Sequence, residues 1–145
     1  MDVTIGKSLE QISMGQAIRY QVFTLEQNIP TELDLDGLDN DSFHALVWDG
    51  GKPVATARLT VNQDGSSTMA RVAVSEEYRG DGVASKIVRA LIKHASNIGV
   101  RCIDIHAHAY LRKYYENFGF EYIREVEIVG EHQLIEMKYQ MEPTV

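Results

Sequence analysis

Hydrophobic residues recur along this chain at two spacings, one typical of helices and one typical of strands. Between residues 83 and 98 they recur every three or four positions, which predicts an amphipathic helix closed by Gly99. Its apolar positions are Ala84, Ile87, Val88, Leu91, Ile92, Ala95 and Ile98. In the segment upstream, alanine and valine occupy four of the five positions 70–74, which predicts a buried strand. A strand followed by a helix is therefore expected at the centre of the fold.

The same spacing argument predicts the other elements. They are a short strand near 2–6, a helix at 9–27 ended by Pro30, two strands in 43–61, a strand at 101–108, a short helix at 109–118 and two strands in 120–140. Strands and helices interleave unevenly, which indicates an α/β fold with a mixed sheet and helices on both faces. A chain of 145 residues is expected to form a single domain spanning 1–145.

The loop between the central strand and helix carries the clearest chemical signal. It reads Arg79-Gly80-Asp81-Gly82-Val83-Ala84 and leads directly into the helix. A helix start offers unpaired N–H groups and the positive end of the helix dipole, and both favour a phosphate. Glycines permit positive φ and let the backbone approach an anion closely. The loop therefore predicts a phosphate-binding site.

Two common phosphate loops fit this stretch poorly. A Walker loop needs Gly-Lys-Ser/Thr, which is absent, and a dinucleotide fingerprint needs glycine where the chain has Ser85. The segment matches Arg/Gln-x-x-Gly-x-Gly/Ala instead, with Arg79, Gly82 and Ala84 at the defined positions. In this it resembles the pyrophosphate loop of the GCN5-related N-acetyltransferases, the GNAT family, which bind acetyl-coenzyme A (acetyl-CoA).

Two further segments extend the resemblance over nearly the whole chain. The run Tyr114-Tyr115-Glu116-Asn117-Phe118-Gly119-Phe120 is similar to the Phe-Tyr-Glu-x-x-Gly-Phe ending of the GNAT domain. The pattern Arg19-x-x-Val22-Phe23-x-x-Glu26-Gln27, followed by an acidic segment and His44, is similar to the ElaA-like branch. The resemblance implies a GNAT fold: one twisted, mostly antiparallel mixed sheet of six to seven strands, with the fourth and fifth strands splayed apart.

By resemblance, the protein is expected to move an acetyl group from acetyl-CoA by direct attack of a primary amine, carried by a small molecule, a lysine or an N-terminus. Tyr115 is expected to act as general acid toward the coenzyme A thiolate, and Glu26 to bind the amine or accept its proton. His44 is a second candidate for substrate contact. The expected coenzyme-binding residues are Val72, Ala73, Val74, Arg79, Gly80, Asp81, Gly82, Val83, Ala84, Ser85, His108 and Tyr115.

Charge and composition limit the partners. The net charge of −7 argues against nucleic acid, because DNA and RNA phosphates would be repelled. No apolar signal core or membrane-spanning run occurs, and Cys102 is alone, so a cytoplasmic protein is expected. Cys102 is expected to be a packed thiol. A homodimer is compatible with the sequence.

Five of the ten residues 32–41 are acidic. A calcium loop fits badly, because Gly37 comes too early and Ala45 stands where glutamate is required. A solvated or capping loop is favoured, with a rim that attracts amines as the alternative.

Two other functions stay open. One is a coenzyme-A-binding regulatory module of the same fold without turnover. The other is a metal-dependent enzyme, because Asp104, His106 and His108 alternate along one strand and would share a face. We expect no metal site. The sequence does not name the acceptor amine, the length of the acyl group or the general base.

Overall fold

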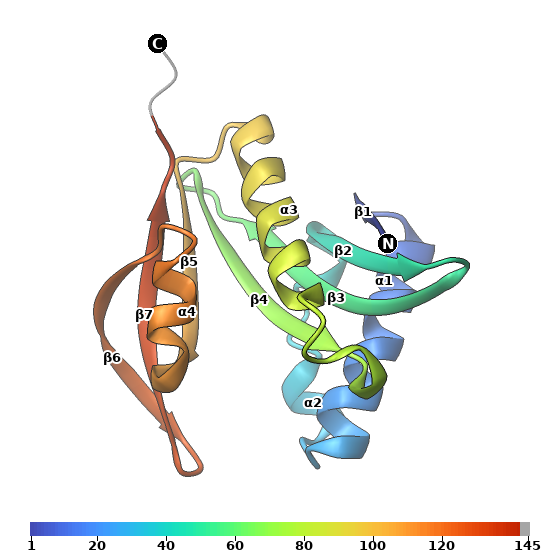
Figure 1. Ribbon diagram of the computed structural model, residues 1–145. Helices are drawn as coiled ribbons and strands as arrows, with labels where there is room; N and C mark the ends of the chain where they lie inside the picture. The colour runs from blue at the N-terminus through green and yellow to red at the C-terminus, as the bar shows by residue number, and fades with distance from the viewer. Residues whose placement is uncertain (143–145) are drawn as a thin grey trace. The chain divides into compact units, whose positions relative to one another are not determined.

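A computed structural model describes residues 1–142, and its ribbon is drawn in Figure 1. The strands are β1 (Asp2–Gly6), β2 (Ser42–Asp49), β3 (Lys52–Val61), β4 (Ser66–Val74), β5 (Cys102–His108), β6 (Glu121–Val129) and β7 (His132–Gln140). The α-helices are α1 (Leu9–Arg19), α2 (Thr31–Asp34), α3 (Val83–Ile98) and α4 (Arg112–Glu116). A π-helix, η1 (Tyr20–Glu26), follows α1, and 3-10 turns lie at Asp39–Asp41, Glu76–Tyr78 and Ala109–Leu111.

The strands form one seven-stranded sheet in the order β1-β2-β3-β4-β5-β7-β6. β1 with β2, β2 with β3, β5 with β7 and β6 with β7 are antiparallel, whereas β4 and β5 are parallel. The parallel register covers Ser66–Thr68 opposite Cys102–Asp104 at the start of both strands, which fits the predicted separation of the fourth and fifth strands. The predicted fold class is therefore confirmed.

The chain divides into two compact units. The first comprises Met1–Thr60 and Met69–Lys93, and the second comprises Val61–Thr68 and the residues from His94 onward. In the first unit, α1 and α3 lie on opposite faces of the strands (Figure 1). In the second unit, α4 lies beside β5 and β7 (Figure 1). The single domain expected from the sequence stays a prediction.

One predicted element differs in type from the element that forms. A continuous helix was expected over 9–27, but α1 ends at Arg19 and the chain continues as η1 to Glu26. Ser8 caps the start of α1 by accepting a hydrogen bond from the Gln11 N–H at 3.1 Å. Because a π-helix shifts each later side chain around the axis, η1 changes the direction in which Glu26 points. Such segments often occur at functional sites.

The core of the first unit joins the π-helix to the sheet. Ile18, Val22, Leu46 and Ala73 form a buried cluster that combines α1, η1, β2 and β4. Ala73 lies within the strand segment expected to hold acetyl-CoA, so apolar packing fixes that segment against the N-terminal helices.

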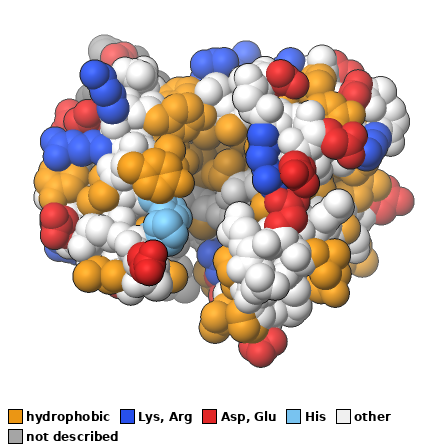
Figure 2. All heavy atoms as spheres, turned by 60° about the horizontal axis from the view of Figure 1, so that its bottom comes forward, with side chains coloured by type: hydrophobic (Ala, Val, Ile, Leu, Met, Phe, Trp, Pro, Cys, Tyr) orange, Lys and Arg blue, Asp and Glu red, His pale blue; other side chains and the backbone are white. Residues whose placement is uncertain are grey.

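The surface shows no segregation of charge on the face in Figure 2, where acidic, basic and hydrophobic side chains are interspersed. None of the helices within residues 1–142 combines the length and the apolar character needed to cross a membrane.

Replacement of Leu46 by alanine tests this core. Leu46 is fully buried in the cluster, so Leu46→Ala is expected to lower the free energy of unfolding by roughly 2–5 kcal/mol, measured by urea denaturation. The control is Leu9→Ala, because Leu9 is 79% exposed and its loss should change stability by less than about 0.5 kcal/mol. Equal losses in the two variants would contradict the packing described here.

Candidate active site

The loop that joins β4 to α3 has the backbone expected of an anion site. Gly80 and Gly82 both have positive φ, 87° and 77°, which other residues rarely adopt. A Cβ atom at either position would meet nothing within 4 Å, so the conformation, and not crowding, calls for glycine. The Lys86 N–H donates to the Gly82 carbonyl at 3.1 Å, so the helical hydrogen bonds of α3 begin at Gly82. The first turn of α3 thus follows a loop in which neither Gly80 nor Gly82 places a side chain near its N–H groups.

The Arg79 side chain links this loop to the N-terminal segment. Its Nε donates to the Val74 carbonyl at 3.0 Å, and its Nη2 donates to Glu26 Oε2 at 2.7 Å. The Glu26 carboxylate therefore lies beside the end of β4 and the start of the loop. The structure brings together three residues that the sequence predicted separately as site residues.

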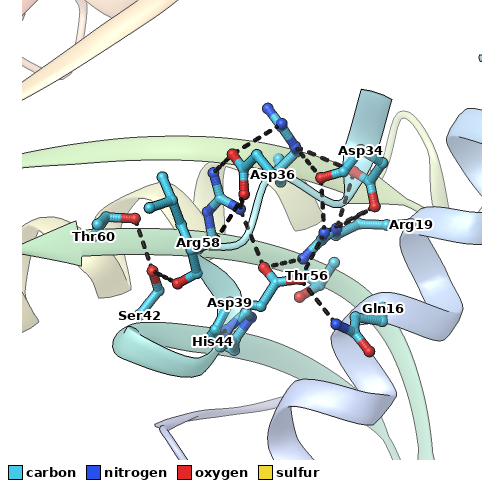
Figure 3. A network of polar contacts seen from close by, with 12 residues as sticks. Gln16, Arg19, Asp34, Asp36, Asp39, Ser42, His44, Thr56, Arg58 and Thr60 are labelled. Atoms are coloured by element: carbon cyan, nitrogen blue, oxygen red, sulfur yellow. Dashed lines mark hydrogen bonds and ion pairs between the residues drawn. The ribbon is translucent and has the colours of Figure 1, made fainter. Parts of the chain in front are cut away.

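Six charged side chains form a ring of ion pairs that holds the acidic segment of the first unit. Figure 3 labels all of them except Arg71. Asp34, Asp36 and Asp39 come from this segment, whereas Arg19 comes from α1, Arg58 from β3 and Arg71 from β4. Each aspartate is paired with two of the arginines. We call this group of six residues the ion-pair ring.

The shortest contacts of the ion-pair ring are at 2.8 Å. They join Arg19 Nη2 to Asp34 Oδ2, Arg19 Nη1 to Asp39 Oδ1, and both Nη atoms of Arg58 to the two carboxylate oxygens of Asp36. Arg19 and Arg58 are 1% and 3% exposed, so both depend on these carboxylates for charge compensation. Burial by itself would raise the pKa of Asp39, but hydrogen bonds from Arg19 and Gln16 hold that pKa far below its usual value.

The expectation of a solvated or capping loop at residues 32–41 is therefore wrong for Asp34 and Asp39, which are buried and paired with arginines. Asp36 agrees with it in part, because its Oδ1 accepts a hydrogen bond from the Leu38 N–H at 3.1 Å, although Arg58 also pairs with it. Two of the arginines, Arg58 and Arg71, were missed by sequence reasoning, because a lone arginine in a strand resembles an ordinary surface residue. The sequence did contain one signal for these ion pairs, because residues 19–71 hold three arginines and residues 34–39 hold three aspartates.

His44 lies next to the ion-pair ring (Figure 3). Its side chain is fully buried, and its Nε2–H donates to the Asp39 carbonyl at 2.9 Å. Burial, only partly offset by this bond, lowers the pKa of His44. His44 thus helps to hold Asp39, and its fully buried imidazole presents no surface for direct contact with a substrate.

Tyr115 belongs to the second unit, on α4. It is 8% exposed and lies among aromatic side chains, with ring centroids 5.1 Å from Tyr114 and 5.7 Å from Phe120. Burial, assisted by Tyr114, raises the pKa of Tyr115 to about 12. The phenol is therefore neutral and carries its proton throughout the physiological pH range.

His108 ends β5 and contacts two other rings, one tilted and one edge-on. Its imidazole centroid lies 5.3 Å from that of Tyr110 and 4.7 Å from that of His132. Burial, together with His132, lowers the pKa of His108. A neutral histidine in an aromatic cluster is suited to packing against an organic ligand.

The three side chains considered as metal ligands, Asp104, His106 and His108, each contact other side chains. Asp104 lies 3.7 Å from Lys138 Nζ, and His106 Nδ1 lies 3.3 Å from Glu127. Within residues 1–142 no group of three or more histidine, cysteine, aspartate or glutamate side chains is arranged to hold a metal ion. Cys102 is a buried free thiol, as expected.

Comparison with known proteins points to one family. The model of the acetyltransferase (GNAT) family matches residues 11–120. The uncharacterized N-acetyltransferase YjcF of Bacillus subtilis is 33% identical over 129 residues, which cover 89% of this chain and 91% of that protein. Escherichia coli ElaA is 28% identical, with a TM-score of 0.84 over 96% of this chain and 99% of its own. An acyl-CoA N-acyltransferase from Pseudomonas aeruginosa is 27% identical, with a TM-score of 0.85 over 95% and 98%.

The environment of His44 predicts a dependence of stability on pH. Because the folded state holds His44 neutral, the unfolded chain binds more protons below about pH 6.5, and the free energy of unfolding should fall as the pH drops through that value. The lowered pKa values of Asp36 and Asp39 stabilise the folded state above about pH 4, and this contribution is lost only as the pH falls below that value. The effect of His44 and the effect of the aspartates therefore fall in separate pH ranges.

Urea unfolding between about pH 7.5 and about pH 5.5 measures this effect. His44→Gln should reduce the slope, and the slope that remains reflects His94 and His108, whose pKa values are also lowered by burial. His106→Gln is the control, because His106 is 49% exposed. An undiminished slope in His44→Gln would refute the assignment.

Proposed function

Since the chain belongs to the acetyltransferase (GNAT) family, we propose that it transfers an acetyl group from acetyl-CoA directly to a primary amine. The amine belongs to a small molecule, a lysine side chain or an N-terminus. The observation that carries the proposal is the loop of Arg79–Ser85, where two left-handed glycines leave the start of α3 open to a diphosphate.

The proposed coenzyme-binding residues of the first unit lie in β4 and in the loop that follows it. We propose that Val72, Ala73 and Val74 line its pantetheine arm and that the Val74 N–H meets the thioester oxygen, where it would stabilise the developing negative charge. The diphosphate lies on the backbone of Arg79–Ser85. The Arg79 side chain is already engaged with Val74 and Glu26, so main-chain N–H groups supply most of the binding. Asp81 is exposed, and its carboxylate has room to point into water.

Tyr115 is proposed as the proton donor. Acyl transfer releases coenzyme A as a thiolate, which requires a proton as the carbon–sulfur bond breaks. With a pKa of about 12 the phenol keeps its proton until negative charge develops on the sulfur, so it first donates a hydrogen bond and then the proton. No hydrogen bond to the Tyr115 hydroxyl is formed by residues 1–142, which leaves it available for this role. His108 is proposed to line the coenzyme.

Glu26 is proposed as the group that meets the amine. The aspartates of the ion-pair ring are neutralised by arginines, so they add little attraction for a cation. Glu26 is bonded to Arg79 through Oε2, whereas Oε1 has no partner within residues 1–142. This second oxygen is placed to accept a hydrogen bond from an ammonium group or, through water, its proton.

Calorimetric titration with acetyl-CoA tests the loop. The protein should bind acetyl-CoA, and Gly82→Glu should abolish binding, because the new carboxylate repels the diphosphate and strains the backbone. Gly65→Glu is the control, because Gly65 also has positive φ and open space around it but lies in the turn before β4. Retained affinity in Gly82→Glu would rule out the loop as the binding site. If the wild type binds acetyl-CoA but releases no thiol with any amine of a panel, the protein is a regulatory module without turnover.

Tyr115→Phe tests the proton donor. Removal of the hydroxyl should lower kcat by roughly 10²- to 10⁴-fold, measured by thiol release, while the Kd for acetyl-CoA stays unchanged. Tyr114→Phe is the control, because its ring packs against Tyr115. Unchanged turnover in Tyr115→Phe would remove Tyr115 from the acid role.

A further inference from the structure

Arg71 has a backbone conformation unusual for its residue type. Its φ is 60° inside β4, a left-handed value that costs free energy for a residue other than glycine, asparagine or aspartate. A left-handed residue within a strand is typical of one class of β-bulge, where glycine is usual. Backbone strain of this kind persists only where the surrounding structure requires it. Because glycine would avoid the strain, the presence of arginine at position 71 indicates that its side chain has a role.

The contacts of Arg71 indicate what the side chain does. Its Nε lies 3.2 Å from Asp34 Oδ1, and its Nη2 lies 3.2 Å from Asp36 Oδ2 and donates to the Leu33 carbonyl at 3.4 Å. Arg71 therefore holds both ends of the segment 33–36. Its side chain is 26% exposed, whereas the other two arginines of the ion-pair ring are buried. Arg71 and Asp36, the latter 31% exposed, are the positions at which the ion-pair ring reaches solvent.

The position of Arg71 in the chain gives these contacts a functional meaning. Val72–Val74, the residues proposed to hold the thioester, follow Arg71 immediately in β4. The segment 33–36 follows η1, which carries Glu26. A single side chain thus connects the strand proposed to hold the acyl donor with the segment that adjoins the proposed amine-binding residue.

We propose that Arg71 is a positioning residue for acetyl transfer, a role that rests on the function proposed above. It keeps segment 33–36 and the end of β4 in one arrangement, so that the amine meets the thioester in a reactive orientation. Misplacement of reacting groups by a fraction of an ångström to 1 Å lowers rates strongly. The strained backbone is retained because glycine, which would relieve the strain, has no guanidinium group to pair with Asp34 and Asp36.

Arg71→Gly separates positioning from stability. Glycine relieves the positive φ and offsets part of the loss of the ion pairs, so the variant is expected to fold. Arg71→Lys keeps the charge and replaces the planar guanidinium by a point charge that cannot hold both aspartates in the same geometry. Arg124→Ala is the control, because Arg124 on β6 is exposed and pairs with Glu136, 2.9 Å away, outside the ion-pair ring.

The first measurement is amide hydrogen exchange of residues 33–39 with and without acetyl-CoA. Coenzyme binding should slow exchange there in the wild type and in Arg124→Ala, but not in Arg71→Gly.

The second measurement is steady-state kinetics with the amine turned over fastest in a panel. Arg71→Gly should lower kcat/KM for that amine roughly 10- to 100-fold, with an unchanged Kd for acetyl-CoA, and Arg71→Lys should show a smaller loss. Millimolar methylguanidine should restore part of the activity of Arg71→Gly alone.

The outcomes distinguish the two proposals. If the wild type does not bind acetyl-CoA, the proposed function fails, and this inference fails with it. If the wild type binds acetyl-CoA but exchange at residues 33–39 is unaffected, or if Arg71→Gly and Arg71→Lys keep the wild-type kcat/KM, the inference alone is overturned. A loss of stability with unchanged kinetics would show that Arg71 has a structural role only.

Discussion

Alternation of charge around six side chains is the constraint on which the N-terminal half of this protein depends. Two guanidinium groups, those of Arg19 and Arg58, are almost fully withdrawn from water, and such burial is costly unless each is paired and hydrogen-bonded. The aspartates provide this because each one is shared between two arginines. Loss of one member leaves each of its two neighbours with a single charged partner, so the ion-pair ring is expected to respond as a coupled network.

The ion-pair ring also determines which acidic groups remain for chemistry. Asp34, Asp36 and Asp39 are each paired with two arginines, and hydrogen bonds from arginines hold the pKa of Asp36 and of Asp39 below its usual value despite burial. Asp36 and Asp39 are therefore poor bases. Glu26 lies outside the ion-pair ring, at the end of the π-helix, and its single arginine contact is with the loop proposed to bind the diphosphate. The aspartates of the ion-pair ring are therefore structural carboxylates, whereas Glu26 keeps one carboxylate oxygen without a hydrogen-bond partner among residues 1–142.

Much of the fold and part of the site could be predicted from local pattern. The strand and helix on either side of the glycine loop were predicted because apolar spacing and the backbone demands of Gly80 and Gly82 are properties of a few consecutive residues. The placement of Tyr115 on a short helix was predicted in the same way. The end of α1 at Arg19 was not, because helical and π-helical segments share nearly the same spacing of apolar side chains over so short a run.

The sequence by itself determined the main strands and helices, the mixed sheet, the glycine loop between β4 and α3 and the family. Only the tertiary structure decided the partners of the charged residues: which aspartate meets which arginine, that His44 is buried, and that Glu26 meets a residue 53 positions away. The physical reason is that secondary structure follows from neighbours in the chain. An ion pair, in contrast, depends on which side chains meet in space, and the sign of a charge does not name its partner.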